Sequence, residues 1–370
     1  MGMPSDSTGP SRLISLDAFR GFTIAAMVMV NYPGSWDHVY APLLHVEWHG
    51  ITPTDLIFPF FIFIVGISVV LAYNRRLQAG LPRGEMYGKI VTRSLKIFGV
   101  GIFLSLYPSF EFESLRVAGV LQRIAIVFAA CAFLYLNSGW KAQARIAAAI
   151  LVFYWLAMTL IPIPGAGKPM LEPGVNLAAW IDQKFLPGRM WQGTWDPEGI
   201  FSTLPAIVTG ITGMLAGKLI ISGKSRELVV IWLFSLGFLS VIAGEMWGWV
   251  FPINKNIWTS SYVLYTSGLA AMTLSAAIFF IDMLGFRKGT GPGIIYGANA
   301  ITAYVLAGVL SVVFYGLPLW GDSINHHFVG LLSGAGTDPR LASLMYALLY
   351  VFIVFLPVYL LYRKRIFIKL

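Results

Sequence analysis

Charge and cysteine are what this 370-residue sequence has least of. Only 12% of its residues are charged and 57% are hydrophobic, whereas soluble domains carry about 25% charged residues. So few charges cannot cover the water-facing surface of a soluble protein of this length. The single cysteine, Cys131, excludes an intrachain disulfide. Its apolar neighbours argue against a catalytic thiolate, because an apolar setting disfavours the charged form.

Other familiar patterns are also absent. No strong internal repeat is visible, which argues against a transporter built from inverted repeats, and the alternation of an outer-membrane barrel is missing. The polar start of the chain and its full-length first apolar block lack the cleavage site of a signal peptide. The net charge of +9 does not predict a nucleic-acid partner, because Lys and Arg cluster at the ends of hydrophobic blocks.

The sequence consists mainly of apolar blocks about 20 residues long, a length that crosses the hydrocarbon core as a helix. We therefore predict an all-α, polytopic membrane protein with a cytoplasmic tail at residues 1–12 and a single transmembrane domain at residues 13–370. About ten transmembrane helices are expected, at approximately 13–33, 53–73, 88–107, 115–136, 143–162, 199–220, 227–246, 257–282, 294–316 and 341–362.

The distribution of basic residues predicts that the N- and C-termini are cytoplasmic. With this orientation the inner segments hold 19 of the 26 Lys and Arg residues and the outer segments hold 6, which is the bias of the positive-inside rule. The longest outer segments are 163–198 and 317–340. Within the first, residues 175–186 are expected to form a short helix on the membrane surface.

Most of the unusual polar residues gather at the predicted outer ends of the spans. Because ionisable groups in or near lipid are costly, residues from distant parts of the sequence at one depth indicate a functional site. The set comprises Asn31, His45, His49, Asp55, Glu198, Glu245, Asn254, Lys255 and Asn256.

Several of these residues also have structural explanations. Residues 52–55 (TPTD) form a good helix start, with Thr52 as N-cap and Asp55 at the third helical position. Glu198, which follows Pro197, is a favourable carboxylate for a first helical turn. Lys255 is suited equally to anchoring the chain at the membrane interface.

His45 is the candidate for chemistry, because a neutral imidazole can take a proton from an attacking amine near neutral pH. It could alternatively accept an acyl group itself, or be an ordinary polar loop residue. His45 and His49 have the i, i+4 spacing of metal ligands on a helix. Pro42 and Gly50 limit such a helix, and no further set of His and Cys residues lies nearby, so we expect no metal.

Three further polar residues lie inside or at the mouth of predicted spans. Arg123, beside Gln122 in the fourth span, must face protein, water or an anion. Two partners for Arg123 stay possible: a ligand with a phosphate or carboxylate group, or a carboxylate at the end of another span. Asn299 in the ninth span is typical of helix-to-helix hydrogen bonding. Asp17 and Arg20 are i, i+3 partners, on a basic inner face that would also suit a phosphorylated cytosolic donor.

The order of several motifs resembles the heparan-alpha-glucosaminide N-acetyltransferase family of transmembrane acyltransferases, in a short bacterial-type form. The matches run from the first predicted span to the eighth, with a looser match at 293–304. They are RLISLDAFRGF at 12–22, Asn31-Tyr32, His45-x-x-Trp48, Thr52-x-x-Asp55 with LIFP after it, GVLQR at 119–123, Pro197-Glu198-Gly199, Ala216-Gly217-Lys218 and Asn254-Lys255-Asn256-x-Trp258-x-x-Ser261-Tyr262.

The resemblance implies that acetyl-CoA is supplied from the cytosol and that its acetyl group ends on the amino group of a terminal glucosamine on the far side. It implies that His45 is catalytic and that Asn31 and Asp55 support it. Two departures are visible: the extra N-terminal luminal region and span of mammalian members are missing, and the family's Trp-Asn-Gly reads Trp48-His49-Gly50 here. The second departure puts acceptor contacts at position 49 in doubt.

From these observations we expect an N-acetyltransferase in a bacterial inner (cytoplasmic) membrane that moves acetyl from cytosolic acetyl-CoA to a hexosamine outside, with His45 as general base or acetyl carrier. The resemblance also suggests a homodimer. The alternatives are a membrane O-acyltransferase of cell-envelope polysaccharide and a secondary transporter, although a transporter would have broken spans near the midplane. The residues expected at acetyl-CoA are Arg20, Gln122, Arg123 and Asn299, and those at the acceptor are Trp48, His49, Glu198, Asn254 and Lys255.

Overall fold

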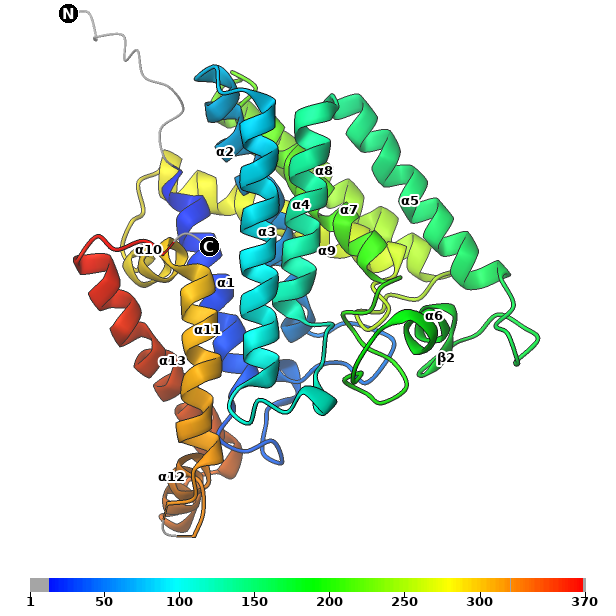
Figure 1. Ribbon diagram of the computed structural model, residues 1–370. Helices are drawn as coiled ribbons and strands as arrows, with labels where there is room; N and C mark the ends of the chain where they lie inside the picture. The colour runs from blue at the N-terminus through cyan, green and yellow to red at the C-terminus, as the bar shows by residue number, and fades with distance from the viewer. Residues whose placement is uncertain (1–12, 320, 369–370) are drawn as a thin grey trace, which may run out of the picture.

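The computed structural model describes residues 13–319 and 321–368, so the predicted tail at 1–12 lies outside the described residues. Helices make up nearly all of the regular structure (Figure 1). The strands in the described part of the chain form one small antiparallel hairpin, β1 (Leu171–Glu172) with β2 (Val175–Asn176). The prediction of an all-α protein is therefore confirmed.

Eight helical stretches among the described residues are long and apolar enough to cross a membrane. The chain is thus a polytopic membrane protein, as predicted. The stretches are α1 (Ile14–Asn31), η2 with α2 (Pro53–Leu56 and Ile57–Gln78), α4 (Val120–Asn137), α5 (Trp140–Leu160), α7 (Thr203–Ile220), α8 (Arg226–Gly248), α9 with the π-helix η4 (Ser260–Ala277 and Ile278–Met283) and α13 (Pro339–Arg363).

The other two predicted spans differ from expectation. The span at 294–316 is a bent pair, α10 (Thr290–Ala298) and α11 (Ala300–Ser311) with the π-helix η5 (Val312–Gly316), whose axes meet at 84°. The span at 88–107 lies within the 24-residue helix α3 (Arg83–Leu106). Its first half carries too many charges for the helix to count as an apolar span. Hydropathy thus predicted about ten spans. Among the described residues, eight helical stretches, or nine with the bent pair, are long and apolar enough to cross a membrane.

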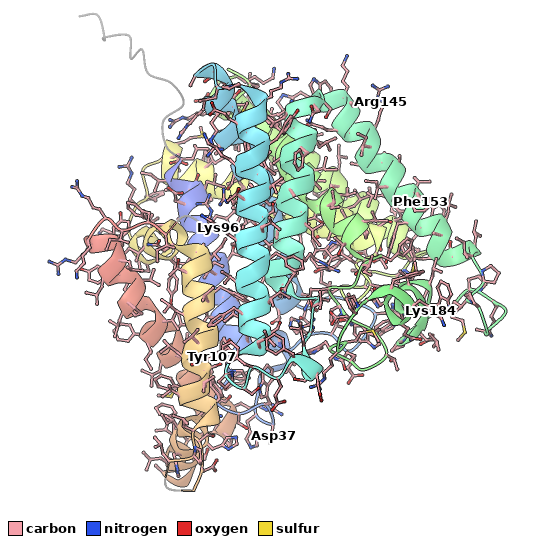
Figure 2. All side chains as sticks on the ribbon, viewed as in Figure 1. Asp37, Lys96, Tyr107, Arg145, Phe153 and Lys184 are labelled. Carbon is pink, nitrogen blue, oxygen red and sulfur yellow. The ribbon has the colours of Figure 1, made fainter. Side chains whose placement is uncertain are left out.

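The connecting segments hold the short helices η1 (Ala41–Leu43), η3 (Phe112–Ser114), α6 (Leu177–Phe185) and α12 (Ile324–Gly334). α6 confirms the predicted short helix, while its place on the membrane surface stays a prediction. Figure 2 shows Asp37, Tyr107 and Lys184 toward one end of the bundle and Arg145 at the other. The loops predicted to be on the outer side therefore share one end, which is where the candidate residues gather.

Close backbone contacts fix the helices that carry the site. A side chain at Gly66 of α2 would clash with the carbonyl oxygen of Gly210 of α7, and one at Gly21 of α1 would clash with Gly293 of α10. Small residues at such contacts let membrane helices approach closely. The start of α2 and the start of α7, which both belong to the site end, are held in one relative position by this packing.

A buried cluster anchors the loops at that end. Tyr154 of α5, Leu177 of α6 and Phe251 in the loop after α8 pack together in it. The Tyr154 hydroxyl also donates to the carbonyl oxygen of Ile257 at 2.6 Å. The loop containing Asn254 and Lys255 is therefore tied to the helical bundle.

Candidate active site

Asp55 organises the first part of the site while also starting a helix. It is fully buried and forms a capping box with Thr52. Its Oδ2 accepts the Thr52 backbone N–H at 3.0 Å, the Thr52 hydroxyl at 2.9 Å and the Val46 N–H at 3.1 Å. With Oδ2 occupied, Oδ1 faces His45. Capping thus uses one oxygen of Asp55, and the contact with His45 uses the other.

His45 reaches this carboxylate from the loop between α1 and α2. Its Nδ1 lies 2.7 Å from Asp55 Oδ1, and the imidazole is about half exposed, at 47%. The backbone N–H next in the chain, that of Val46, is bonded to the same carboxylate, which fixes the loop beside it. The short Nδ1 contact means that this nitrogen donates its proton to Asp55, so Nε2 carries the free lone pair.

Lys255, in the loop between α8 and α9, completes this group. Its Nζ lies 2.9 Å from His45 Nδ1, 3.1 Å from Nε2 and 3.6 Å from Asp55 Oδ1. Because Nδ1 donates to Asp55, the ammonium can donate only to Nε2. Burial lowers the pKa of Lys255, while the Asp55 charge acts to raise it. The structure therefore brings His45, Asp55 and Lys255 together as a triad of contacts.

His49 and Asn254 form a second pair next to this triad. Asn254 is fully buried, and its Oδ1 accepts the Ile257 N–H at 3.1 Å. That bond turns the Asn254 amide nitrogen toward His49 Nδ1, 3.2 Å away. Burial lowers the pKa of His49, opposed by Glu172, and a neutral imidazole is what an acceptor at Nδ1 requires.

Trp48 forms an aromatic wall beside His49. Its indole N–H donates to the Leu171 carbonyl at 2.8 Å, and its ring meets Trp195 edge to face at 5.2 Å between centroids. The β1–β2 hairpin and the 189–198 segment thus close over the 45–49 loop. Of the predicted acceptor residues, Trp48, His49, Asn254 and Lys255 lie in this one neighbourhood.

Glu198 belongs to an ion-pair cluster that the sequence did not predict. Arg116 holds Asp196 through two bonds of 2.7 and 2.6 Å and Glu198 through one of 2.5 Å. Burial acts to lower the pKa of Arg116, but the two carboxylates outweigh it and the pKa is raised. Glu198 does not stand in a first helical turn, since α7 begins at Thr203. Arg116 counted in the sequence only as one more outer basic residue.

Arg123 lies deeper, at the start of α4, and is 1% exposed. Its Nη2 donates to the Ser202 hydroxyl at 2.5 Å and to the Gly199 carbonyl at 3.2 Å. The guanidinium lies over the Trp258 ring at 5.0 Å. No ion pair with a carboxylate is present within the described residues, and its Nε and Nη1 have no partner there. Two buried donors are therefore available to a ligand.

Gln122, Asn31 and Arg20, which were also predicted as site residues, have different surroundings. Gln122 is buried against Gly101 and Gly119, with its amide nitrogen unpartnered among the described residues. Asn31 is exposed at the end of α1, and its side chain has no hydrogen bond within the described part. Arg20 donates to Ser68 at 3.0 Å and pairs with Asp17 at 3.4 Å. The predicted Asp17–Arg20 pair is confirmed.

Asn299 stands at the break between α10 and α11. Its amide nitrogen donates to the Ile366 carbonyl at 3.1 Å, and its oxygen accepts the Ile368 N–H at 2.9 Å. Its side chain therefore binds the backbone of the C-terminal segment. This accounts for both the polar residue and the interruption of the span.

Asp182 of α6 is a buried carboxyl that sequence reasoning missed, because a single Asp in a short helix gives no signal. It is 2% exposed, and its Oδ1 accepts the Ile200 N–H at 2.8 Å. Burial raises its pKa from 3.8 to about 6, against opposing effects of that hydrogen bond and of Arg123. Asp182 holds the 199–200 turn, which in turn supplies the carbonyl that binds Arg123.

We expect this carboxyl to make folding stability depend on pH. The folded chain binds more protons than the unfolded chain between pH 3.8 and about 6. The stabilising effect is therefore present below the lower value and is lost, by about 3 kcal/mol, as pH rises through the upper one. Asp182→Asn should remove this slope, so that the variant gains thermal stability over wild type at pH 7.5 but much less at pH 5. Parallel melting-temperature curves for the two proteins would contradict this assignment.

Comparison with known proteins identifies the family to which the chain belongs. A family model described as heparan-alpha-glucosaminide N-acetyltransferase, catalytic, matches residues 12–246. This chain belongs to that family. The heparan-alpha-glucosaminide N-acetyltransferase of Homo sapiens is 30% identical, with 98% of this chain and 60% of that protein covered. The Mus musculus protein of the same name is 29% identical, with 82% and 54% covered.

Most of the site lies within the range that the family model matches. His45, Asp55, Arg116, Arg123 and Glu198 lie in the matched range. Asn254 and Lys255 lie beyond it, as do α9 to α13. The chain spans 60% and 54% of the length of these two relatives.

Proposed function

We propose that this chain is a transmembrane N-acetyltransferase that moves acetyl from acetyl-CoA to the amino group of a hexosamine. The observation that carries the proposal is the bond between His45 Nδ1 and Asp55 Oδ1. It fixes the tautomer whose Nε2 can accept a proton, and the half-exposed ring can meet a substrate. The name of the human relative indicates the acceptor class, a glucosaminide.

The reaction that this arrangement supports begins with a neutral amine attacking the thioester carbonyl carbon. The new C–N bond forms as the amine proton moves to His45 Nε2, and Asp55 stabilises the resulting imidazolium. The C–S bond then breaks, and the thiolate of CoA takes the proton from Nε2. In the variant with an acetyl carrier, Nε2 attacks the thioester carbon first, the C–S bond breaks and the thiolate of CoA leaves. The amine then attacks the acetyl carbon, the bond from that carbon to Nε2 breaks, and the amine proton passes to the released imidazole. Both versions need the same lone pair.

Lys255 and Asn254 are the donors proposed for the developing oxyanion. Lys255 Nζ is 3.1 Å from Nε2, so it occupies the position that a reacting amine must approach. Substrate entry would move the ammonium from the imidazole to the carbonyl oxygen, where negative charge develops. Asn254, fixed by its own bond to Ile257, supports the ring of His49 at the acceptor side.

Arg123 and Gln122 are proposed to contact the acetyl-CoA arm, because their buried donors lack partners in the described chain. Arg20 and Asn299 are proposed to contact acetyl-CoA at the end of the bundle opposite His45. Both side chains also bind other parts of the chain. Glu198 and Asn31 are proposed as more distant acceptor and supporting residues. The positive-inside rule supports an orientation with both termini cytoplasmic. The proposed location is a bacterial inner membrane, and the proposed assembly is a homodimer.

The broken span at Asn299 is the one feature that favours the alternative of a secondary transporter. Interrupted helices in transporters place free backbone groups around a substrate. Here the side chain at the break binds the C-terminal segment instead, so the transporter remains the second candidate.

The decisive experiment incubates the purified chain with radiolabelled acetyl-CoA and matched sugars. We expect label on glucosamine and none on N-acetylglucosamine or glucose, which offer hydroxyls without a free amine. Label on the hydroxyl-only sugars would establish the O-acyltransferase alternative. No label on any acceptor, together with solute uptake into vesicles, would replace the proposal with the transporter.

A further inference from the structure

The contact between His49 and Asn254 fixes which nitrogen of the His49 ring carries a proton. Asn254 is fully buried, and one terminal atom of its side chain meets the Ile257 backbone N–H at 3.1 Å. A backbone N–H can only donate, so that atom must be the amide oxygen. The other terminal atom, Nδ2, therefore donates to His49 Nδ1 across 3.2 Å.

His49 is left with one unused donor as a result. Because Nδ1 accepts a hydrogen bond, the proton of the neutral ring lies on Nε2. The side chain is exposed, and its Nε2 has no hydrogen bond within the described chain. Partial burial lowers the pKa of His49, which favours the neutral ring, while the charge of Glu172 acts in the opposite direction. The ring thus presents a single N–H group to the outside.

Backbone contacts hold this imidazole in place. The Gly50 N–H donates to the Ile253 carbonyl at 2.8 Å, and Gly50 has a φ of +110°, a conformation that favours glycine. The Asn254 N–H donates to the Thr259 hydroxyl at 3.0 Å. The loop that carries His49 and the loop before α9 are therefore joined through the backbone as well. A donor that is fixed in advance loses little conformational freedom when it binds a partner.

Trp48 adds an apolar surface next to the free donor. Its indole N–H is already bound to the Leu171 carbonyl at 2.8 Å, so what it can offer a ligand is the ring itself. The ring centroids of Trp48 and His49 are 6.0 Å apart. An apolar ring beside one well-placed polar group is typical of small-molecule sites. It suits a sugar ring, which has both C–H faces and hydroxyl groups.

The donor also lies beside the proposed reacting centre. Lys255 contacts His45, and the residue before it, Asn254, contacts His49. Consecutive Cα atoms are about 3.8 Å apart, so the two imidazoles meet neighbouring positions of one loop. A hexosamine carries oxygens on the two ring carbons next to the amine-bearing carbon. With its amine at His45, one of these oxygens would lie toward His49.

We propose that His49 determines acceptor specificity: its Nε2–H donates to one of these oxygens of the hexosamine, while the Trp48 ring contacts a C–H face of the sugar. The inference rests on the proposed function, because it concerns the acceptor of the same site. His49 does not touch the reacting atoms in this arrangement. It selects an amine that has a neighbouring hydroxyl over one that lacks it, since a site built to bind a hydroxyl discriminates against an analogue without one.

Equilibrium binding of sugars to the purified full-length chain, without acetyl-CoA, tests the inference. The probes are glucosamine and its 1-deoxy, 3-deoxy and 4-deoxy analogues. With wild type we expect either the 1-deoxy or the 3-deoxy sugar to bind about tenfold more weakly than glucosamine, and the 4-deoxy sugar to bind as glucosamine does. With His49→Asn this discrimination should disappear, because loss of the donor and loss of the hydroxyl remove the same contact.

Two further variants separate the contact from a structural effect. His49→Asn keeps an amide oxygen for Asn254 Nδ2, so its melting temperature should match that of wild type. His49→Gln has a longer side chain that places an amide donor near the former Nε2, so it should restore discrimination. The matched control is His38→Asn, at an exposed histidine of the same loop, which should bind all four sugars as wild type does.

The outcomes for His49 and for the reaction can be told apart. If wild type binds the four sugars equally or not at all, or if His49→Asn discriminates as wild type does, the role of His49 is refuted. Acetyl transfer to glucosamine by wild type is measured separately with radiolabelled acetyl-CoA. Transfer without discrimination would overturn only the inference about His49, whereas discrimination without transfer would overturn only the proposed reaction.

Discussion

His45→Ala is expected to lower the rate of acetyl transfer by about 10²–10⁴-fold, the usual contribution of a positioned general base. The variant removes the Nε2 lone pair, while Asp55 keeps its three bonds to Thr52 and Val46. The imidazole is about half exposed, so its loss should leave the folded state nearly unchanged. Initial rates with radiolabelled acetyl-CoA and glucosamine, together with the melting temperature in detergent, measure both effects.

The chain offers a matched control for this substitution. His326 on α12 also pairs with a carboxylate, Asp322, at 2.9 Å, and is similarly exposed at 55%. His326→Ala removes the same groups outside the site, so transfer should be unchanged. Wild-type rates for His45→Ala would show that the His45–Asp55 pair has no catalytic part, and the mechanism proposed above would then be abandoned.

Asp55→Asn is expected to reduce transfer by a comparable factor, about 10²–10⁴-fold, through the wrong tautomer of His45. The amide oxygen would be kept at the Oδ2 position, where three donors converge. The amide nitrogen would then face His45 Nδ1, which could no longer donate and would instead accept. The proton would move to Nε2, and the base would be lost.

Comparison of two substitutions separates this effect from helix capping. Asn keeps an acceptor for Thr52 and Val46, so Asp55→Asn should cost little stability. Asp55→Ala removes the cap as well, which costs about 1 kcal/mol, and it leaves buried donors unpaired. If Asp55→Asn transfers acetyl as fast as wild type while Asp55→Ala loses stability, Asp55 only caps α2. Rates and melting temperatures for both variants distinguish these outcomes.

Several parts of the site could be read from the residues alone. The TPTD motif at 52–55 predicted both the beginning of a helix and the carboxylate of Asp55, the last residue of that motif. The motif order indicated the family. The loop histidine between two spans was predicted as the base, and this stays a prediction. Hydropathy predicted eight spans correctly, and it missed the charged first half of α3 and the break at Asn299. In both cases a count of apolar residues averages over local interruptions.

Other parts became visible only in three dimensions. Lys255 was predicted as a polar residue at the correct depth, but its contact with His45 joins positions 210 residues apart. Arg116 and Asp196 are 80 residues apart and gave no sign of pairing. Asp182 gave no signal in the sequence, because its burial depends on how α6 packs under the 199–200 turn.

The sequence by itself determined the depth of each polar group, because a hydrophobic block of fixed length sets where along the membrane normal its ends must lie. Only the tertiary structure decided which groups are lateral neighbours. Lateral position depends on which helices pack together, and here that is fixed by close backbone contacts such as Gly66 against Gly210. The imidazole, its carboxylate and its ammonium partner meet because α2, α7 and α9 pack side by side.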